Sequence, residues 1–124
     1  MQLDRDKSSG IVIRSFSAGE LRVNDQVINA PVILTADEII TTWSPPAFSE
    51  LSIADFGPAL DRDPEVILFG TGPAQRFPDT GLMTEIMRNG IGFEVMDTAA
   101  ACRTFNVLAA ESRRVIAVLL LDAT

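Results

Sequence analysis

The sequence predicts an α/β domain of three layers, with a mixed central sheet, an antiparallel β-ribbon at the N-terminal end and helices on the faces. Residues 66–69 and 115–121 are continuous apolar runs, typical of strands that are covered on both faces. Residues 80–89 and 98–110 carry apolar side chains at helical spacing, and they alternate with the strands along the chain. The 124 residues fit one domain, residues 1–124, which can bury a core without disulfides or metal.

The first third of the chain predicts the ribbon. Residues 1–10 are polar, and we expect them to be disordered. Short segments of alternating apolar and polar residues follow, separated by residues that favour turns. Pro31 opens one more strand. The predicted strands are residues 11–17, 21–23, 26–28 and 32–34, and the turns within the ribbon fall at residues 18–19 and 24–25.

The segment after the fourth strand is compatible with two structures. Residues 35–38 (Thr-Ala-Asp-Glu) fit a capping box, which could start a helix over Ile39 and Ile40. The β-branched residues 39–42 favour a strand instead. We favour the strand, because Ser44, Pro45 and Pro46 would end any helix within two turns.

Three helices are predicted from their caps. Asp55 is the expected N-cap of the first, with Pro58 in the first turn, where its missing N–H costs little. Thr80 is expected to cap the second helix and Asp97 the third. The predicted helices cover residues 56–62, 80–89 and 98–110.

The second half of the chain therefore reads strand, helix, strand, helix, strand. The crossover from residues 66–69 to residues 93–96 should be parallel and right-handed. Residues 115–121 are the most apolar strand, so we expect them at the centre of the sheet.

Composition excludes several functional classes. The net charge is −7, and the only adjacent basic pair is Arg113 and Arg114, so we expect no nucleic-acid binding. No apolar run is long enough to span a membrane, and the N-terminal residues lack the apolar region of a secretory signal. We therefore expect a soluble, cytoplasmic protein. The sequence contains no histidine, which excludes Ser-His-Asp and Cys-His catalysis and zinc sites that need imidazole.

One edge of the predicted sheet could hold a ligand. Gly70, Thr71 and Gly72 follow a buried strand, and Arg76 lies near enough in sequence to add a positive charge. Turn N–H groups at the carboxyl end of a parallel sheet can bind an anion, so these four residues are a candidate ligand site. The spacing matches neither a dinucleotide-binding loop nor a Walker loop, and the glycines could simply turn the chain.

Other chemistry-bearing residues are better explained by structure. Cys102 is expected on the apolar face of its helix, with no histidine to lower its pKa, so we interpret it as a buried structural residue. The acidic residues between Asp55 and Glu65 lack the spacing of an EF-hand loop, so we expect no metal site. Met83, Met87 and Met96 are expected to fill the core. We predict no catalytic residue and no cofactor.

Trp43 precedes the stiff loop at Pro45 and Pro46, and an aromatic beside such a loop suits an interface. These three residues are therefore the candidate surface for a protein partner, although Trp43 could instead cap the core. The composition also leaves a homodimer open.

Several short stretches together resemble a small family of domains of unknown function. That family includes the mitochondrial assembly factor three of NADH dehydrogenase (complex I) and the adipogenesis-associated domain protein. The resemblance covers nearly all of residues 11–121. The stretches that carry it are Ile33-Leu34 followed by Trp43, residues 66–72, Asp97-Thr98 with Ala101-Cys102 and Thr104-Phe105-Asn106, and Arg113-Arg114-Val115.

The resemblance implies a three-layer α/β fold with a mixed sheet and, for the mitochondrial members, a non-catalytic role in assembling complex I. It brings no catalytic residues. The resulting expectation is a non-catalytic interaction domain similar to an assembly factor. The alternative is a protein or enzyme that binds an anionic small molecule at residues 70–72.

Overall fold

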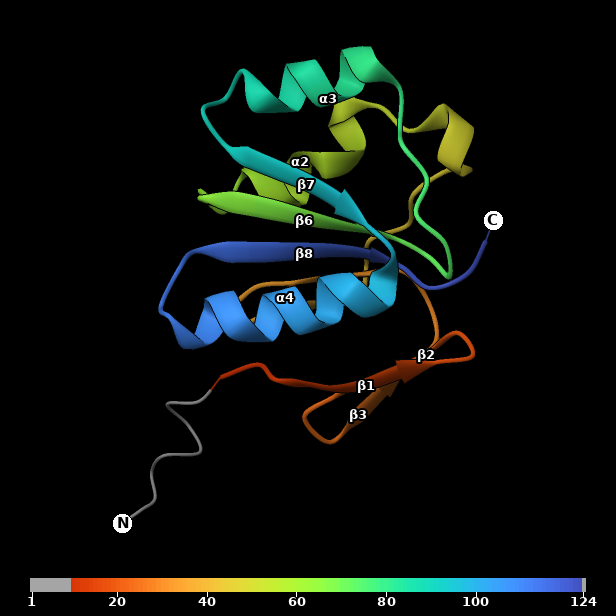
Figure 1. Cartoon of the computed structure of the whole chain (residues 1–124), viewed down its shortest axis with the longest axis vertical. Coiled ribbons are helices and arrows are strands. Elements are labelled where there is room, and N and C mark those ends of the chain that lie inside the picture. The colour runs from red at the N-terminus through yellow and green to blue at the C-terminus, as the bar shows by residue number, and fades with distance from the viewer. Residues whose placement is uncertain (1–9, 124) are drawn as a thin grey trace.

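The computed structural model describes residues 10–123, so the predicted disorder of the first nine residues lies outside the described part (Figure 1). Two sheets and three α-helices make up this part. The elements in chain order are β1 (Ile13–Ser17), β2 (Glu20–Val23), β3 (Gln26–Ile28), β4 (Val32–Leu34), β5 (Ile39–Ile40), two 3₁₀ turns (Phe48–Glu50 and Ile53–Phe56), α2 (Gly57–Leu60), β6 (Val66–Thr71), α3 (Thr80–Met87), β7 (Gly92–Met96), α4 (Thr98–Ala110) and β8 (Val115–Leu120).

The larger sheet is mixed and has the strand order β5-β4-β8-β6-β7. β8 lies at its centre, parallel to β6 and antiparallel to β4. β6 and β7 are parallel, which confirms the predicted direction of the two strands, and the central position of β8 confirms the expectation from its apolar sequence. The smaller sheet is the predicted antiparallel ribbon, in the order β1-β2-β3.

Both faces of the larger sheet are covered. The ribbon and α4 pack on one face, and α2, α3 and the 3₁₀ turns pack on the other (Figure 1). Alternate residues of β6 divide between the two cores: Leu68 contacts the ribbon side, whereas Ile67 and Phe69 contact the α3 side. This two-sided burial explains why β6 and β8 are apolar without alternation. The predicted three-layer fold is confirmed.

A cluster of aromatic rings lies in the second core, which is the one on the α3 side of the larger sheet. The Phe56 ring meets the Phe69 ring edge-on at 5.2 Å between centroids, and it meets the Phe93 ring in the same way at 5.7 Å. Phe48 stacks on Phe69 at 6.1 Å. Edge-to-face and offset pairs of this kind add about 0.5–1.5 kcal/mol each beyond the burial of area.

Two of the predicted caps are wrong by a short distance. Ser52 is the N-cap of the 3₁₀ turn that leads into α2, and Asp55 is at the third position of that turn, where its carboxylate accepts from Ser52 N at 2.9 Å. Asp79, and not Thr80, caps α3 by accepting from Gly81 N at 3.0 Å. Aspartate and threonine both make good caps, so sequence alone does not separate two adjacent candidates.

Two further local predictions hold. Asp97 caps α4 by accepting from Ala100 N at 2.8 Å. The favoured strand at Ile39–Ile40 is β5. The Thr35 hydroxyl accepts from Glu38 N at 2.9 Å, so the capping-box pattern makes a tight turn between β4 and β5 and starts no helix.

Candidate functional site

Gly70, the first residue of the predicted ligand edge, lies where α4 crosses the sheet. A Cβ atom built on Gly70 would lie 2.9 Å from both Leu119 Cδ2 and Thr98 Oγ1. Real Cβ atoms do not approach other heavy atoms so closely, so a larger residue would push α4 away from the sheet. Helix packing therefore accounts for this glycine.

Gly72 is held by α4 through Thr98. Its φ of +99° is a left-handed conformation that favours glycine. Gly72 N donates to Thr98 Oγ1 at 2.8 Å, and Thr98 N donates back to the Gly72 carbonyl at 2.9 Å. The fully buried Thr98 hydroxyl donates in turn to the Leu120 carbonyl at 2.6 Å. The Gly72 N–H group, which could have donated to an anion, is therefore already bonded within the chain.

The polar groups of Thr71 and Arg76 are also bonded within the chain. The Thr71 hydroxyl donates to the Ala74 carbonyl at 2.7 Å and accepts from Arg76 N at 3.0 Å. The Arg76 guanidinium donates to the Thr71 carbonyl at 3.0 Å and to the Ala123 carbonyl at 3.1 Å, and it lies 4.2 Å from the centroid of the Phe48 ring. The structure thus brings the four predicted residues together, but their polar groups bind one another and the neighbouring backbone.

Trp43 lies in the core, which corrects its predicted role as an accessible contact. The side chain is 7% exposed, and Nε1 donates to the Asp55 carbonyl at 2.8 Å. Pro45 is half-buried and Pro46 is exposed. The ring packs in the second core, which agrees with the alternative that Trp43 caps the core. Of the three candidate residues, only the two prolines are on the surface.

Cys102 is buried as predicted. It is 6% exposed, and burial raises the pKa of its thiol to about 12. A thiol with such a pKa holds almost no thiolate near neutral pH, so Cys102 is a poor nucleophile. Among residues 10–123, no group of three cysteine or carboxylate side chains is placed to hold a metal ion.

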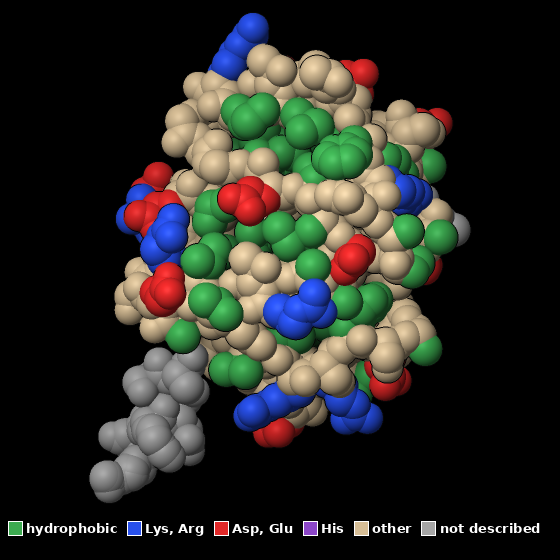
Figure 2. Space-filling view, viewed as in Figure 1, with side chains coloured by type: hydrophobic (Ala, Val, Ile, Leu, Met, Phe, Trp, Pro, Cys, Tyr) green, Lys and Arg blue, Asp and Glu red, His purple; other side chains and the backbone are tan. Residues whose placement is uncertain are grey.

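Large apolar side chains lie on the surface instead. Phe77 is 65% exposed, Val107 56%, Met87 45% and Val27 42%. Figure 2 shows hydrophobic side chains gathered on the face that carries β7 and α4. The expectation that all three singled-out methionines fill the core is wrong for Met87, because the end of α3 leaves its side chain in solvent. No helix within residues 10–123 is long and apolar enough to cross a membrane.

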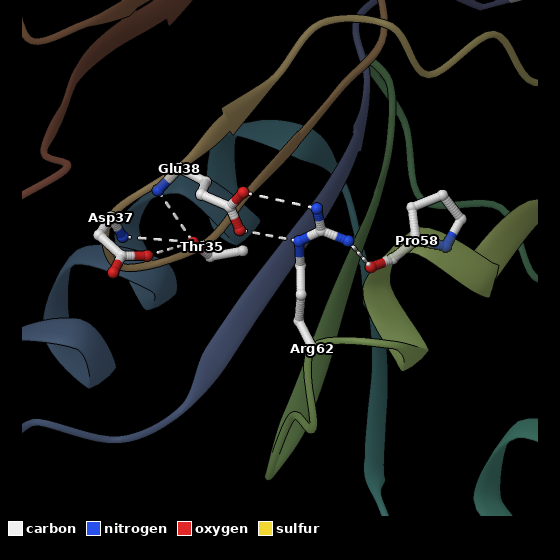
Figure 3. Close-up of polar contacts among 5 residues, drawn as sticks. All are labelled: Thr35, Asp37, Glu38, Pro58 and Arg62. Atoms are coloured by element: carbon white, nitrogen blue, oxygen red, sulfur yellow. Dashed lines mark hydrogen bonds and ion pairs between the residues drawn. The ribbon is translucent and has the colours of Figure 1, made fainter.

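A groove of about 1010 Å³ lies beside the start of β8, at the end of the parallel strands that is opposite to Gly70 and Gly72. The Glu38 carboxylate accepts from Arg62 Nε at 2.8 Å at its rim, and Arg62 Nη1 donates to the Pro58 carbonyl at 2.7 Å (Figure 3). The hydrogen bond to Glu38 raises the pKa of Arg62. The sequence does not indicate this groove because distant segments form its walls: residues 10–12, 35–38, 109–110 and 112–116, with Arg62 and Asn106.

The basic pair Arg113 and Arg114 is paired with acidic residues. Glu65 accepts from Arg114 N at 3.0 Å and from Arg113 Nε at 3.3 Å, and these contacts lower the pKa of the Glu65 carboxyl. Arg114 Nε also donates to the Asp63 carbonyl at 2.8 Å. These arginines therefore anchor the start of β8 to the start of β6.

Known proteins resemble this chain over almost all of its length. The NADH dehydrogenase [ubiquinone] 1 alpha subcomplex assembly factor 3 of Danio rerio is 29% identical over 120 residues, which cover 95% of this chain and 68% of that protein. The NMR structure of a Xanthomonas campestris protein is 37% identical, with a TM-score of 0.83, and the match covers 91% of this chain and 86% of that one.

A Bordetella pertussis protein described as an Mth938-like domain is 25% identical, with a TM-score of 0.79, over 98% of this chain and 93% of that one. These similarities confirm both the fold and the resemblance predicted from the sequence. The profile of the family described as "Protein of unknown function (DUF498/DUF598)" matches residues 13–120, so the chain belongs to this family.

Proposed function

We propose that this chain is a non-catalytic interaction domain that helps to assemble a respiratory NADH dehydrogenase. The observation that carries the proposal is the similarity to an assembly factor of that enzyme over 95% of the chain. A match of this extent includes the surfaces of the domain as well as its core. The proposal includes a protein partner and the cytoplasmic location expected from the sequence.

The chemistry of the candidate sites supports a binding role. The chain has no histidine, and the thiol of Cys102 has a pKa of about 12. Gly72 N and the Arg76 guanidinium, which could have bound an anion, are engaged by the chain itself. Exposed Phe77 and Val107 are instead suited to burial against another protein.

A deletion strain tests the proposal. Deleting the gene should lower the amount of assembled NADH dehydrogenase on native gels, and a plasmid-borne copy of the chain should restore it. A second membrane-bound respiratory complex, measured in the same membranes, should stay constant. Equal amounts of assembled enzyme with and without the gene would rule out the assembly role.

A pull-down identifies the partner. The tagged chain, purified from its own cells in mild detergent, should retain NADH dehydrogenase subunits at a fixed ratio, and an unrelated tagged protein of similar charge should not. A preparation without any such subunit would contradict a direct interaction.

A further inference from the structure

β7 ends the larger sheet, and its outer side is unpaired within residues 10–123. Gly92 N donates to the Glu65 carbonyl at 3.0 Å, which fixes the inner side of the strand. Alternate residues of a strand direct their N–H and C=O groups to opposite neighbours. Gly92, Glu94 and Met96 therefore bond toward β6, whereas the backbone groups of Phe93 and Val95 point to the open edge.

A side chain already occupies one position on this edge. Gln75 Nε2, from the loop after β6, donates to the Val95 carbonyl at 3.0 Å. An amide N–H thus binds where the N–H of a neighbouring strand would bind. Phe93 N–H, Phe93 C=O and Val95 N–H remain for a further strand. The opposite edge, β5, has only two residues and gives no comparable template.

Exposed apolar side chains belong to the segments that adjoin β7. Phe77 follows Gln75 by two residues and is 65% exposed, and Met87 ends α3, which packs against β7, with 45% exposure. Figure 2 shows hydrophobic side chains gathered between α3 and β7. An extended segment paired with β7 would adjoin this hydrophobic surface, and flexible methionine side chains adapt to varied partners.

The charge of Glu94 indicates which kind of partner segment could pair with β7. Glu94 is exposed at the centre of β7, and it forms no ion pair within the described residues. The antiparallel self-pairing that uses both Phe93 and Val95 would place Glu94 directly opposite Glu94 of a second copy. Like charges at opposite positions are destabilising, and the net charge of −7 adds to the repulsion. A basic residue opposite Glu94 would be stabilising instead.

We propose that β7 binds an extended segment of a partner protein by strand addition, with lysine or arginine opposite Glu94 and apolar residues on either side. Backbone hydrogen bonds at Phe93 and Val95 supply affinity, and the alternation of basic and apolar side chains supplies specificity. The inference rests on the proposed function, because it assigns the surface through which an interaction domain would meet its partner.

Amide hydrogen exchange on the whole chain tests the inference. The probe is a seven-residue peptide in which valine and lysine alternate, and the control peptide alternates valine and glutamate. The lysine peptide should slow exchange at the Phe93 and Val95 amides, while Glu94 and Met96, already bonded to β6, should change little. Absence of binding, or protection confined to another surface, would overturn the proposal.

Charge reversal provides the matched variants. Glu94→Arg should weaken binding of the lysine peptide by about tenfold, because an attractive cross-strand pair becomes repulsive. Glu111→Arg makes the same change of charge at an exposed residue after α4 and should leave the affinity unaltered. Equal affinities of the two variants would contradict the role of Glu94.

The deletion strain separates this inference from the proposed function. If the unmodified chain restores NADH dehydrogenase and Glu94→Arg does not, while Glu111→Arg does, both proposals are supported. If both variants restore the enzyme, the function stands and the β7 surface is wrong. If the strain lacks any assembly defect, the function is wrong, and the exchange experiment alone decides whether β7 binds a strand.

Discussion

The side-chain amide of Asn106 makes with the backbone of Ile13 the two hydrogen bonds that a neighbouring strand would make. Ile13 N donates to Asn106 Oδ1 at 3.0 Å, and Asn106 Nδ2 donates to the Ile13 carbonyl at 2.8 Å. β1 is an edge of the ribbon, so α4 covers that edge with a single residue. The pair joins positions that are 93 residues apart and attaches the ribbon to the rest of the domain.

Asn106→Ala should lower the free energy of unfolding by about 1–3 kcal/mol, because it leaves a partly buried N–H and C=O of Ile13 without partners. Urea denaturation followed by circular dichroism measures the change. Val107→Ala, at the adjacent and 56% exposed residue, should stay within about 0.5 kcal/mol of the original chain. If the two variants unfold at the same urea concentration, the Asn106 pair does not stabilise the ribbon.

Thr98→Val should lower the free energy of unfolding by about 2–4 kcal/mol. Valine keeps the shape of threonine but leaves the buried Gly72 N and the Leu120 carbonyl without the hydroxyl, and each unsatisfied buried group costs about 1–3 kcal/mol. Thr104→Val is the control, since its partly buried hydroxyl donates to Ala100 of its own helix. Thermal unfolding of the three proteins should rank Thr98→Val clearly lowest, and a ranking with Thr104→Val lowest would contradict the assigned role.

Arg76→Ala should lower the melting temperature without changing the response to phosphate. The Arg76 guanidinium binds the Thr71 and Ala123 carbonyls, so its removal loses structural contacts, and no anion site is removed with it. Differential scanning fluorimetry with sodium phosphate, against sodium chloride of equal ionic strength, makes the comparison, with the exposed Arg88→Ala as control. A phosphate-specific rise that disappears only in Arg76→Ala would restore the anion-binding interpretation of this edge.

Alkylation of Cys102 by iodoacetamide should be very slow at neutral pH in the folded protein and fast in denaturant, because the folded thiol has a pKa of about 12. The sign of the pH dependence follows from the same shift. Unfolding lets the thiol ionise near its ordinary pKa of 9.0, so stability is retained below that pH and decreases as the pH rises toward 12. Cys102→Ala should lack this decrease, and a parallel dependence in both proteins would show that other groups cause it.

The central position of the last strand could be predicted, because a strand that is buried on both faces has a continuous apolar sequence. Val115 to Leu120 is apolar without alternation, and only a central strand with helices on both sides needs such a run. Trp43 was harder to place, because its burial depends on the Asp55 carbonyl, 12 residues further on, and on the aromatic core.

The candidate site shows the same limit. Gly70, Thr71, Gly72 and Arg76 are close in sequence, so their meeting at one edge could be foreseen. Their partners are distant: Thr98 lies 26 positions from Gly72, and Ala123 lies 47 positions from Arg76. The topology of the fold determines which distant residues meet. A local sequence pattern therefore does not show that a possible ligand-binding group is already hydrogen-bonded to another part of the chain.

The central place of β8 has a consequence for biosynthesis. β4 and β6 meet only through β8, so a nascent chain that stops short of Val115 carries both strands with the edges that bond to β8 unpaired. No early part of this chain can complete its core on the ribosome. A chain still in translation therefore exposes unpaired strand edges, and such edges favour aggregation until the last strand is made. A chain truncated before Val115 lacks the strand that joins β4 to β6 and that contributes side chains to both cores.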